Sequence, residues 1–440
     1  MINYKKIFLS AFLKAFLATI IFVISFVFYN TELVREKVED IAFDSINKFY
    51  IFNKEQNISS PNVFEFVIDD LYMQKNKLFD EDNHTNYGYI FPRDKIAKFI
   101  QNLDILANEE LDENAYPKAL FIDYDFSFTS SEYGKELSRG DSKLIEVLKA
   151  KHKYKILLPM TSKYNFIKDS KDKELQNAIK SGSIEFVSVS LLAIDGVIRR
   201  YLSVDKFGTK HPTKEYKSAN VKLFELIDNS NKNNFEKDDI IANRILFKSY
   251  KDVNSSEEYC KVEQSKWSKL RKYSASCNIF AIPYEDYNNS IIMLGGAYTG
   301  NGDSFDILDV FNAKKFTGID IHANTLMSML HLNGKLKRLS LAASITIVFI
   351  TFLLIDFIIN LLFSIAKVEN YKLTFLVMLL VNGAILFAIS AYILQIYKLW
   401  FNWFIPVVLI QMLELIILLK KKSPKLAFRS AKLFSKIIKR

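Results

Sequence analysis

The sequence has few of the residues and motifs on which most catalytic sites depend. It contains two cysteines and five histidines, and the histidines are too scattered to form a cluster with metal-ligand spacing. The HExxH and GxSxG motifs are absent, and the glycines between residues 295 and 302 match neither GxGxxG nor the Gly-Lys-Ser/Thr pattern of phosphate-binding loops. The sequence therefore predicts a protein that is not an enzyme and that holds no metal and no cofactor.

The chain has instead four long apolar segments. The first, at residues 7–28, lies close to the start, and three more follow near the end, at residues 339–366, 373–396 and 400–419. Each is long enough for a helix that crosses the roughly 30 Å hydrocarbon core of a bilayer, which takes about 20 residues. We therefore expect four transmembrane helices, the first within residues 1–29. Residues 30–338 form one large polar block between the first helix and the second.

Positive charge is concentrated at the two ends of the chain. The formal net charge is +10, yet residues 420–440 carry nine Lys or Arg and no acid, and residues 1–29 carry three Lys and no acid. The polar block is therefore close to neutral, which argues against a nucleic-acid partner. The positive-inside rule places both termini and the basic tail, residues 420–440, in the cytoplasm. We expect a multi-pass protein of a bacterial inner membrane with a large periplasmic domain. A cleavable signal peptide is the alternative for the first segment, although no small-x-small cleavage site follows it.

Both cysteines and four sequons for N-glycosylation lie in the polar block. Cys260 and Cys277 predict a disulfide, as is common in exported domains, and two free thiols are the alternative. Each sequon has an acid two residues before its asparagine, which resembles the extended acceptor of bacterial oligosaccharyltransferases; an asparagine-rich composition is the alternative. The candidate acceptors are Asn57, Asn83, Asn254 and Asn288.

Hydrophobic periodicity predicts alternating strands and helices in the polar block. Helices are expected after Pro92, over residues 141–150, near residues 219–227 and after Gly318, and residues 206–277 are expected to form an insertion or a helical elaboration. This alternation favours an α/β fold, a mostly parallel sheet flanked by helices. The expected strands are residues 63–69, 118–126, 153–159, 279–284 and 290–298, with two more in residues 184–204 around an Asp195-Gly196 turn.

Several motifs in this block occur in the order of a known family. They are VFEFVIDD, YIFPRDKIAKFIQNL, KALFIDYDFSF, IDGVIRRYLSV, MLGGAYTGNGDSF and FTGIDIHANTL. Together they resemble the CHASE domain of the second type, an extracytoplasmic sensory domain of bacterial receptors. The resemblance covers about residues 30–338 and extends to the layout of one span before the domain and three after it. Thr317 departs from the family, which usually has a proline before this glycine.

The resemblance implies a membrane-bound sensory or binding protein. Family members usually continue into a cytoplasmic kinase or cyclase, whereas residues 420–440 contain no such motif. We therefore expect a receptor, often a homodimer in this layout, that takes part in signal transduction by relaying its signal to a separate cytoplasmic or membrane output protein. The alternative is a structural or assembly factor of the cell envelope that uses the exported domain as a protein-interaction module.

Ligands of open parallel sheets bind at the carboxyl ends of the strands, where loops and helix N-termini meet. The polar residues at these positions are the candidates for ligand binding. Alternatively, the acids cap loops and helices, and the His and Asn hold the last helix against the sheet. The candidates are Asp69, Asp70, Arg93, Asp123, Asp125, Asp303, His322 and Asn324.

Three charged residues fall inside the expected spans, in the third nearest the cytoplasm. They are Lys14, Asp356 and Glu414. Because a charge in the hydrocarbon core is costly unless it is paired, we hypothesise that Lys14 pairs with Asp356 or Glu414 and thereby couples the first span to the later ones.

Overall fold

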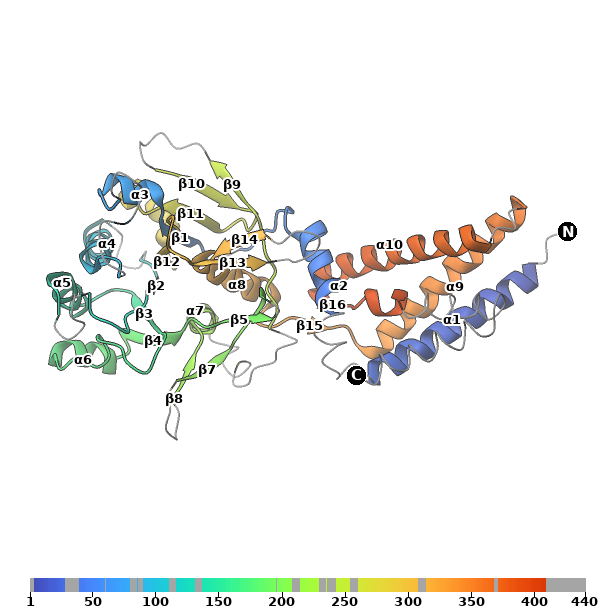
Figure 1. Cartoon of the computed structure of the whole chain (residues 1–440), viewed down its shortest axis with the longest axis horizontal. Helices are drawn as coiled ribbons and strands as arrows, with labels where there is room; N and C mark the ends of the chain where they lie inside the picture. Colours follow the sequence, from blue (N-terminus) through green and yellow to red (C-terminus); the bar gives the residue numbers. More distant parts are fainter. Residues whose placement is uncertain are drawn as a thin grey trace. The chain divides into compact units, whose positions relative to one another are not determined.

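The fold is described from a computed structural model, in which the chain forms two compact units. One unit is Asn47–Lys335, here the α/β unit, and the other combines Met1–Ile46 with Leu336–Arg440, here the helical unit (Figure 1). The α/β unit falls within the predicted block of residues 30–338. The structure describes residues 4–27, 39–59, 61–79, 85, 90–110, 116–130, 137–194, 196–207, 214–228, 235, 243–253, 260–307, 314–367 and 371–408.

A mixed sheet, eight-stranded among the described residues, forms the centre of the α/β unit, in the order β4-β3-β2-β12-β1-β11-β10-β9. The strands from β4 to β11 in this order pair in parallel, and β10 and β9 are antiparallel. The middle strands are buried on both faces, which explains their nearly continuous apolar sequences. The strands are β1 (Val63–Ile68), β2 (Ala119–Asp123), β3 (Lys155–Met160), β4 (Ile184–Ser188), β9 (Tyr250–Val253), β10 (Val262–Ser265), β11 (Leu270–Ser274) and β12 (Ile291–Gly296).

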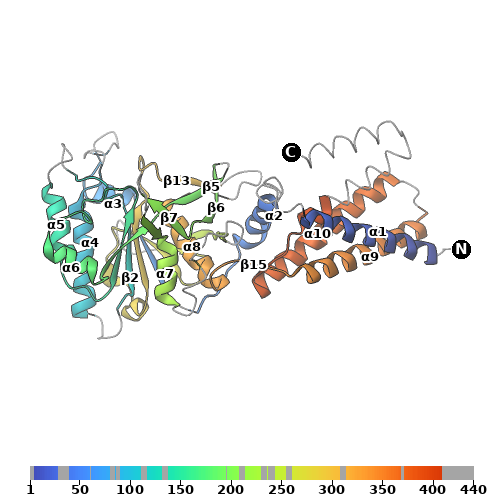
Figure 2. The ribbon, with the colours of Figure 1, turned by 90° about the horizontal axis from the view of Figure 1, so that it is seen from below.

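Helices cover both faces of this sheet. α3 (Asp70–Lys75), α4 (Arg93–Ile105), α5 (Arg139–Leu148) and α6 (Lys173–Lys180) lie on one face, and α7 (Ala219–Ile227) and α8 (Gly318–Leu332) lie on the other (Figure 2). A large apolar core between the sheet and α4 and α5 includes Phe66, Ile100, Ile122, Leu144 and Leu294. The predicted helices at these places, and the predicted strands that became β1, β2, β3 and β12, are therefore confirmed.

Side-chain caps fix where the helices begin. Ser138 caps α5 in a capping box with Asp141, so α5 begins two residues before the predicted start. Thr317, the departure from the family pattern, makes a second capping box with Asp320 at the start of α8. The hydroxyl of Thr317 accepts the N–H of Asp320, an interaction that a proline could not make.

Three sequence predictions for the sheets were wrong. Residues 184–204 form parts of four strands rather than two. β5 and β6 pair antiparallel on either side of residues 195–196, as predicted, but β4 before them ends in the main sheet and the chain then enters a second sheet, order β14-β13-β6-β5. Residues 279–284 form short 3-10 turns, η6 (Ile279–Ala281) and η7 (Tyr284–Tyr287), where Asn278 caps the first and Pro283 precedes the second. The other strands concerned are β5 (Leu191–Ile194), β6 (Val197–Tyr201), β7 (Val204–Phe207), β8 (Lys214–Lys217), β13 (Ser304–Ile307) and β14 (Lys314–Thr317).

The third error concerns residues 206–277: in place of an insertion or a helical elaboration, they supply β9, β10 and β11 of the main sheet as well as α7. These strands are polar because Glu263 and Lys272 face each other across the antiparallel pair β10 and β11. A cross-strand pair of opposite charges stabilises a sheet without an apolar pattern. β11 nevertheless lies directly beside β1 and aligns in register with it from Val63 to Val67.

The helical unit contains α1 (Tyr4–Val27), α2 (Glu39–Ile46), α9 (Leu341–Ile365) and α10 (Tyr371–Tyr397), with β15 (Lys337–Arg338) paired to β16 (Leu399–Trp400). Within the described residues, α1, α9 and α10 are the helices long and apolar enough to cross a membrane. Small residues of α1, Ala15 and Ala18, pack with Val348 and Phe352 of α9, as is usual between membrane helices. These three helices indicate a membrane protein.

The predicted fourth span lies mostly outside the described residues. Residues 399–400 form β16 and residues 404–408 are helical, so the beginning of the segment 400–419 is not one continuous helix. The fourth span remains a prediction.

Candidate functional site

A cavity of about 610 Å³ lies at the carboxyl ends of β2 and β12 in the α/β unit. This is the edge at which open parallel sheets bind ligands. Its walls come from segments that are far apart in the sequence and that meet because their strands are neighbours in the sheet. The lining residues are Ile90, Phe91, Arg93, Asp123, Tyr124, Asp125, Phe128, Val189, Leu191, Gly296, Tyr298, Asn301, Asp303, Phe305, Gly318 and His322.

Asp123, the last residue of β2, lines this cavity. Its main chain is paired with Gly295 of β12, which holds the side chain at the strand end. Burial raises the pKa of its carboxyl to about 7, because the charged form loses its contact with water. Among the described residues, no hydrogen-bond donor and no cation contacts this carboxyl.

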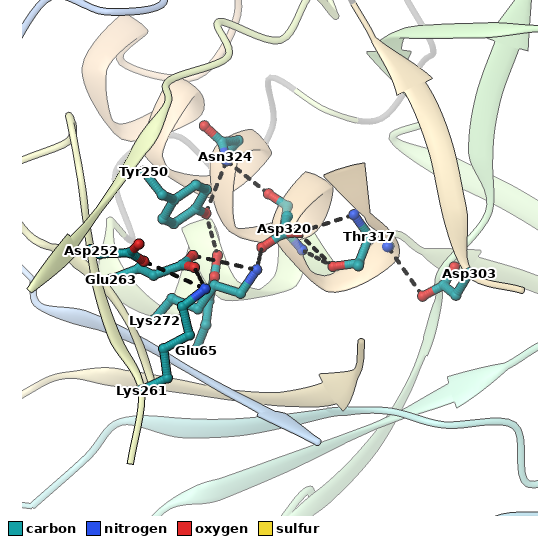
Figure 3. A network of polar contacts seen from close by, with 11 residues as sticks. Glu65, Tyr250, Asp252, Lys261, Glu263, Lys272, Asp303, Thr317, Asp320 and Asn324 are labelled. Atoms are coloured by element: carbon teal, nitrogen blue, oxygen red, sulfur yellow. Dashed lines mark hydrogen bonds and ion pairs between the residues drawn. The ribbon is translucent and has the colours of Figure 1, made fainter. Parts of the chain in front are cut away.

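Asp303 lies opposite, in the loop between β12 and β13. Its Oδ2 accepts a hydrogen bond of 3.1 Å from the N–H of Gly318, the first residue of α8 (Figure 3). A Cβ at Gly318 would lie 2.6 Å from the same oxygen, so a larger residue there would displace the carboxylate of Asp303. Burial, and then the negative charge of Asp123, raise the pKa of Asp303 to about 6, although the Gly318 N–H and His322 oppose the shift.

His322 projects from α8 into the same cavity. Its Nδ1 lies 3.0 Å from Nδ2 of Asn220 and accepts a hydrogen bond from it, so the proton of the neutral ring is on Nε2. The ring packs edge-on against Phe121, with the centroids 5.3 Å apart. Burial lowers the pKa of His322 to about 4 despite the nearby Asp303, so the imidazole is neutral at physiological pH.

Arg93 is the cation of the cavity and is buried at the start of α4. It donates from Nη2 to the main-chain oxygen of Asp125, and its guanidinium lies 4.6 Å above the ring of Phe126. Burial lowers the pKa of Arg93 to about 10, and Asp141 and Asp125 oppose this shift, so the side chain stays charged. Its Nε atom has no acceptor among the described residues.

Asp125 faces its own loop more than the cavity, since its Oδ1 accepts the N–H of Ser127 at 2.8 Å and the hydroxyl of Thr161. The structure thus brings five of the sequence candidates to one cavity. These are Arg93, Asp123, Asp125, Asp303 and His322.

Three other candidates do not line this cavity. Asp69 caps α3 by accepting the N–H of Tyr72 at 2.9 Å. Asp70 accepts both the N–H and the hydroxyl of Thr299, at 2.7 and 2.8 Å, and so fastens the loop after β12. These hydrogen bonds of the two acids are of the kind that the alternative interpretation expects, and a ligand-binding role for them and for Asn324 remains a prediction.

Asn324 belongs to a polar network behind the cavity that the sequence analysis did not identify. The amide of Asn324 donates to the hydroxyl of Tyr250 at 3.1 Å, and this hydroxyl donates to Glu65 at 2.8 Å (Figure 3). Nearby, Lys272 forms an ion pair of 2.7 Å with Asp320 of α8. The signal in the sequence was Glu65 itself, an acid inside the apolar strand VFEFVI.

Electrostatics bind this network together. Burial raises the pKa of Glu65 well above its usual value, and Asp320 adds to the shift. Burial acts against the charge of Lys272, but the surrounding carboxylates of Asp320, Glu65 and Glu263 keep its pKa above the usual value. The network therefore pairs its carboxylates with a cation, Lys272, whereas no cation among the described residues pairs with Asp123 or Asp303 in the cavity.

The remaining sequence candidates lie elsewhere. Cys260 and Cys277 are joined by a disulfide. Asn57 and Asn288 are exposed, as an acceptor asparagine must be, while Asn83 and Asn254 lie outside the described residues; glycosylation remains a prediction.

Inside the helical unit, Lys14 lies on α1 and Asp356 lies on α9. The Nζ of Lys14 lies 3.8 Å from the sulfur of Met378, and Asp356 accepts a hydrogen bond of 3.4 Å from the amide of Asn382. Glu414 lies outside the described residues. The proposed pairing of Lys14 with Asp356 or Glu414 remains a prediction.

A second polar cluster, in the helical unit, joins three segments at the ends of its helices. Buried Glu39, the first residue of α2, accepts hydrogen bonds of 3.1 Å from Arg338 and 2.8 Å from the indole of Trp400. The ring of Trp400 also packs against Phe43 of α2, with centroids 5.3 Å apart. We call Glu39, Arg338 and Trp400 the Glu39 clasp.

Comparison with known proteins identifies the family. The model of the CHASE2 domain matches residues 18–358, which is more than half of the chain. Comparisons with curated proteins and with solved structures give no match. The matched segment contains every residue of the cavity described above, and the CHASE2 domain is an extracellular sensory domain. The chain therefore belongs to the CHASE2 family.

Proposed function

We propose that the protein is a membrane-bound sensor. Its α/β unit lies on the periplasmic side of a bacterial inner membrane, binds a small molecule in the cavity and passes the signal to a separate output protein, with the chain acting as a homodimer. Membership of a family of extracellular sensory domains supports the sensory role. The Cys260–Cys277 disulfide supports an oxidising compartment for this unit.

The observation that carries the proposal is the carboxyl of Asp123. The other acids at this sheet edge accept hydrogen bonds that serve the fold, whereas no described donor reaches Asp123. A partly buried carboxyl without a partner at the wall of a cavity costs free energy when it is charged, and such costs are retained where a ligand or a reaction uses the group. A cavity with a few polar groups among apolar walls is the usual form of a small-molecule site.

The Glu39 clasp supports a relay into the helices. Glu39 begins α2, Arg338 directly precedes α9, and Trp400 directly follows α10. Glu39 forms hydrogen bonds with both partners. A movement of the chain where it enters or leaves the α/β unit, at residues 46–47 or 335–336, would therefore shift the ends of α9 and α10. β15 and β16 add main-chain hydrogen bonds between the same two connections.

The test uses the full chain in lipid nanodiscs and a library of small molecules. Thermal unfolding of the α/β unit reports binding, and hydrogen exchange in α2 and β15 reports the response of the helical unit. We expect compounds that raise the unfolding temperature to change exchange in α2 as well. The proposed sensory function would be contradicted if no compound of the library binds, or if binding leaves hydrogen exchange in α2 and β15 unchanged.

A clasp variant separates binding from relay. Arg338→Gln is expected to keep ligand binding and lose the exchange response in α2. The matched control is Arg271→Gln, which removes another arginine–carboxylate pair, with Asp286, within the α/β unit. If both variants respond like the original chain, the clasp does not relay the signal.

Topology and partners are tested separately. Reporter fusions at residue 440 and in the exposed loop near Asn288 should report cytoplasm and periplasm, respectively. Mass measurement of the nanodisc complex tests the homodimer. Co-purification of the chain with a kinase or cyclase would support the relay. If the chain binds no ligand and co-purifies with cell-wall proteins, the result would support an assembly factor.

A further inference from the structure

We propose that the ligand of the cavity is an organic amine, a positively charged nitrogen on an apolar body, held by the carboxylates of Asp123 and Asp303. This inference rests on the proposed function, because it names the ligand class for the same cavity.

Neither of the two carboxyls forms an ion pair with a cation among the described residues, because Arg93 has its own partners. Asp123 has no described polar partner for its side chain, and Asp303 accepts one main-chain hydrogen bond, from Gly318. They are near enough for the charge of Asp123 to raise the pKa of Asp303. A cation between them would remove both the mutual repulsion and part of the cost of burial. The cavity is therefore built to gain most from a positively charged group.

A negatively charged ligand would be repelled by the two carboxylates of the cavity. Most of the Arg93 guanidinium is already compensated by the main-chain oxygen of Asp125, the ring of Phe126 and the carboxylate of Asp141, and its Nε lacks an acceptor among the described residues. His322 is neutral, so it adds no positive charge. A negatively charged ligand would have to approach Asp123 and Asp303, and no further cation in the described lining would offset that repulsion.

A bare metal ion fits less well than an amine. Hard cations take six or more oxygen ligands, usually including several carboxylates. No group of three His, Cys, Asp or Glu side chains in the described part of the chain is arranged to hold a metal. An ammonium group needs only two or three hydrogen-bond acceptors, which Asp123 and Asp303 can supply.

Aromatic walls indicate what carries the nitrogen. Phe91 stacks on Tyr124, with ring centroids 5.1 Å apart, and the ring of Tyr298 is tilted against Phe91, with centroids 6.2 Å apart. Phe128 and Phe305 also line the cavity, and Phe128 is 63% exposed. Rings of this kind bury an apolar body and attract a cation through their faces. An arylalkyl amine combines both properties.

Binding should depend on pH, because the amine requires ionised carboxylates. The groups that face Asp123 and Asp303 are Arg93 of α4, Tyr124 and Asp125 after β2, Tyr298 after β12 and His322 of α8. Arg93 stays charged and His322 stays neutral above about pH 5. The pKa values of about 7 for Asp123 and about 6 for Asp303 therefore predict that affinity rises with pH up to about pH 7. Binding should release protons below that pH.

The experiment is isothermal titration calorimetry of the full chain in nanodiscs with three matched probes. 2-Phenylethylamine is the cation, 2-phenylethanol is neutral, and 3-phenylpropionate is the anion. We expect the amine to bind at least about tenfold more tightly than the alcohol, as charge-assisted hydrogen bonds suggest, and the anion not to bind. At pH 6, titrations in two buffers of different ionisation enthalpy should reveal the released protons.

Variants assign the effect to the cavity. Asp123→Asn and Asp303→Asn should each weaken amine binding by about 10- to 100-fold. The matched control is Asp252→Asn, since Asp252 is exposed on β9 and forms an ion pair with Lys261 outside the cavity. Proton release in the unaltered chain gives a second readout that needs no variant to fold.

The outcomes distinguish failure of the proposed ligand class from failure of the proposed sensory function. Tight amine binding with proton release, lost in both cavity variants, supports the inference. If the alcohol or the anion binds as tightly as the amine, or if the Asp123→Asn variant still binds the amine with full affinity, the ligand is not an amine. The proposal that the cavity binds a small molecule would remain. If none of the probes binds at up to about 1 mM, the inference is overturned, and the library experiment decides the sensor independently.

Discussion

Replacing Asp123 with asparagine should make the protein more stable at neutral pH while removing ligand binding. Burial moves the pKa of this carboxyl from its usual 3.8 to about 7 in the folded chain. Because the folded state binds the proton more tightly than the unfolded state, folding loses stability as pH rises between these two values. Each pH unit corresponds to about 1.4 kcal/mol, so the ionised carboxyl costs up to about 4 kcal/mol above pH 7. Below about pH 4 it costs nothing.

Asparagine has the shape of the protonated acid and cannot ionise. The variant and the original chain should therefore be almost equally stable near pH 4, and the variant should gain progressively up to about pH 7. The gain should then stay constant at higher pH. Asp303 contributes to the pH dependence of both proteins, so the difference between their stabilities is the quantity that isolates Asp123.

The assay is urea unfolding of the full chain in nanodiscs at several pH values, followed by pulse proteolysis. Fluorescence of Trp267, which is fully buried in the α/β unit, provides a second signal. Asp252→Asn is the control, because this acid is exposed and its removal should give no comparable gain. A destabilised Asp123→Asn variant, or a difference that does not change with pH, would refute the reasoning and assign Asp123 to the fold.

Three further predictions concern other parts of the chain. Cys277→Ser opens the disulfide with Cys260 and should lower stability by about 3 kcal/mol in urea unfolding; reducing agent should produce the same loss in the original chain and none in the variant. Glu39→Gln removes the charge of the clasp and should cost about 1–2 kcal/mol, seen as faster hydrogen exchange in β15; unchanged exchange would show that the clasp is not stabilising. Gly318→Ala places a Cβ 2.6 Å from Asp303 and should weaken amine binding about tenfold without unfolding α8; full binding would mean that Asp303 does not hold the ligand in this position.

The sequence predicted those parts of the fold whose burial follows a simple period. β1, β2, β3 and β12 are apolar because both of their faces are covered, and α4 and α8 have clear N-terminal signals at Pro92 and Thr317–Asp320. β9, β10 and β11 were missed because their stability comes from charge pairs such as Glu263 with Lys272, which leave no apolar pattern. Local propensity gives no information about such partners across the sheet.

The candidate site was predictable for a topological reason. Asp123 and Asp303 follow neighbouring parallel strands, and the ends of such strands necessarily meet at one edge of the sheet. The sequence could not separate Asp123 from Asp69, since both are acids at strand ends. Their difference lies in hydrogen bonding: Asp69 caps α3 through Tyr72, whereas Asp123 is left without a described donor. Only the three-dimensional arrangement of donors decides which acid is available to a ligand.

The anchoring of α8 indicates which part of the cavity can respond to an amine. The start of this helix is held by the capping box of Thr317 with Asp320, and Asp320 is itself held by Lys272 of β11 at 2.7 Å. Asp303, in contrast, reaches the helix through one hydrogen bond to Gly318. An ammonium group that draws the carboxylate of Asp303 toward Asp123 would weaken that bond while the capping box keeps the helix in place. The movement would therefore arise in the loop before β13, and β13 would carry it into the second sheet through its pairing with β6 and β14.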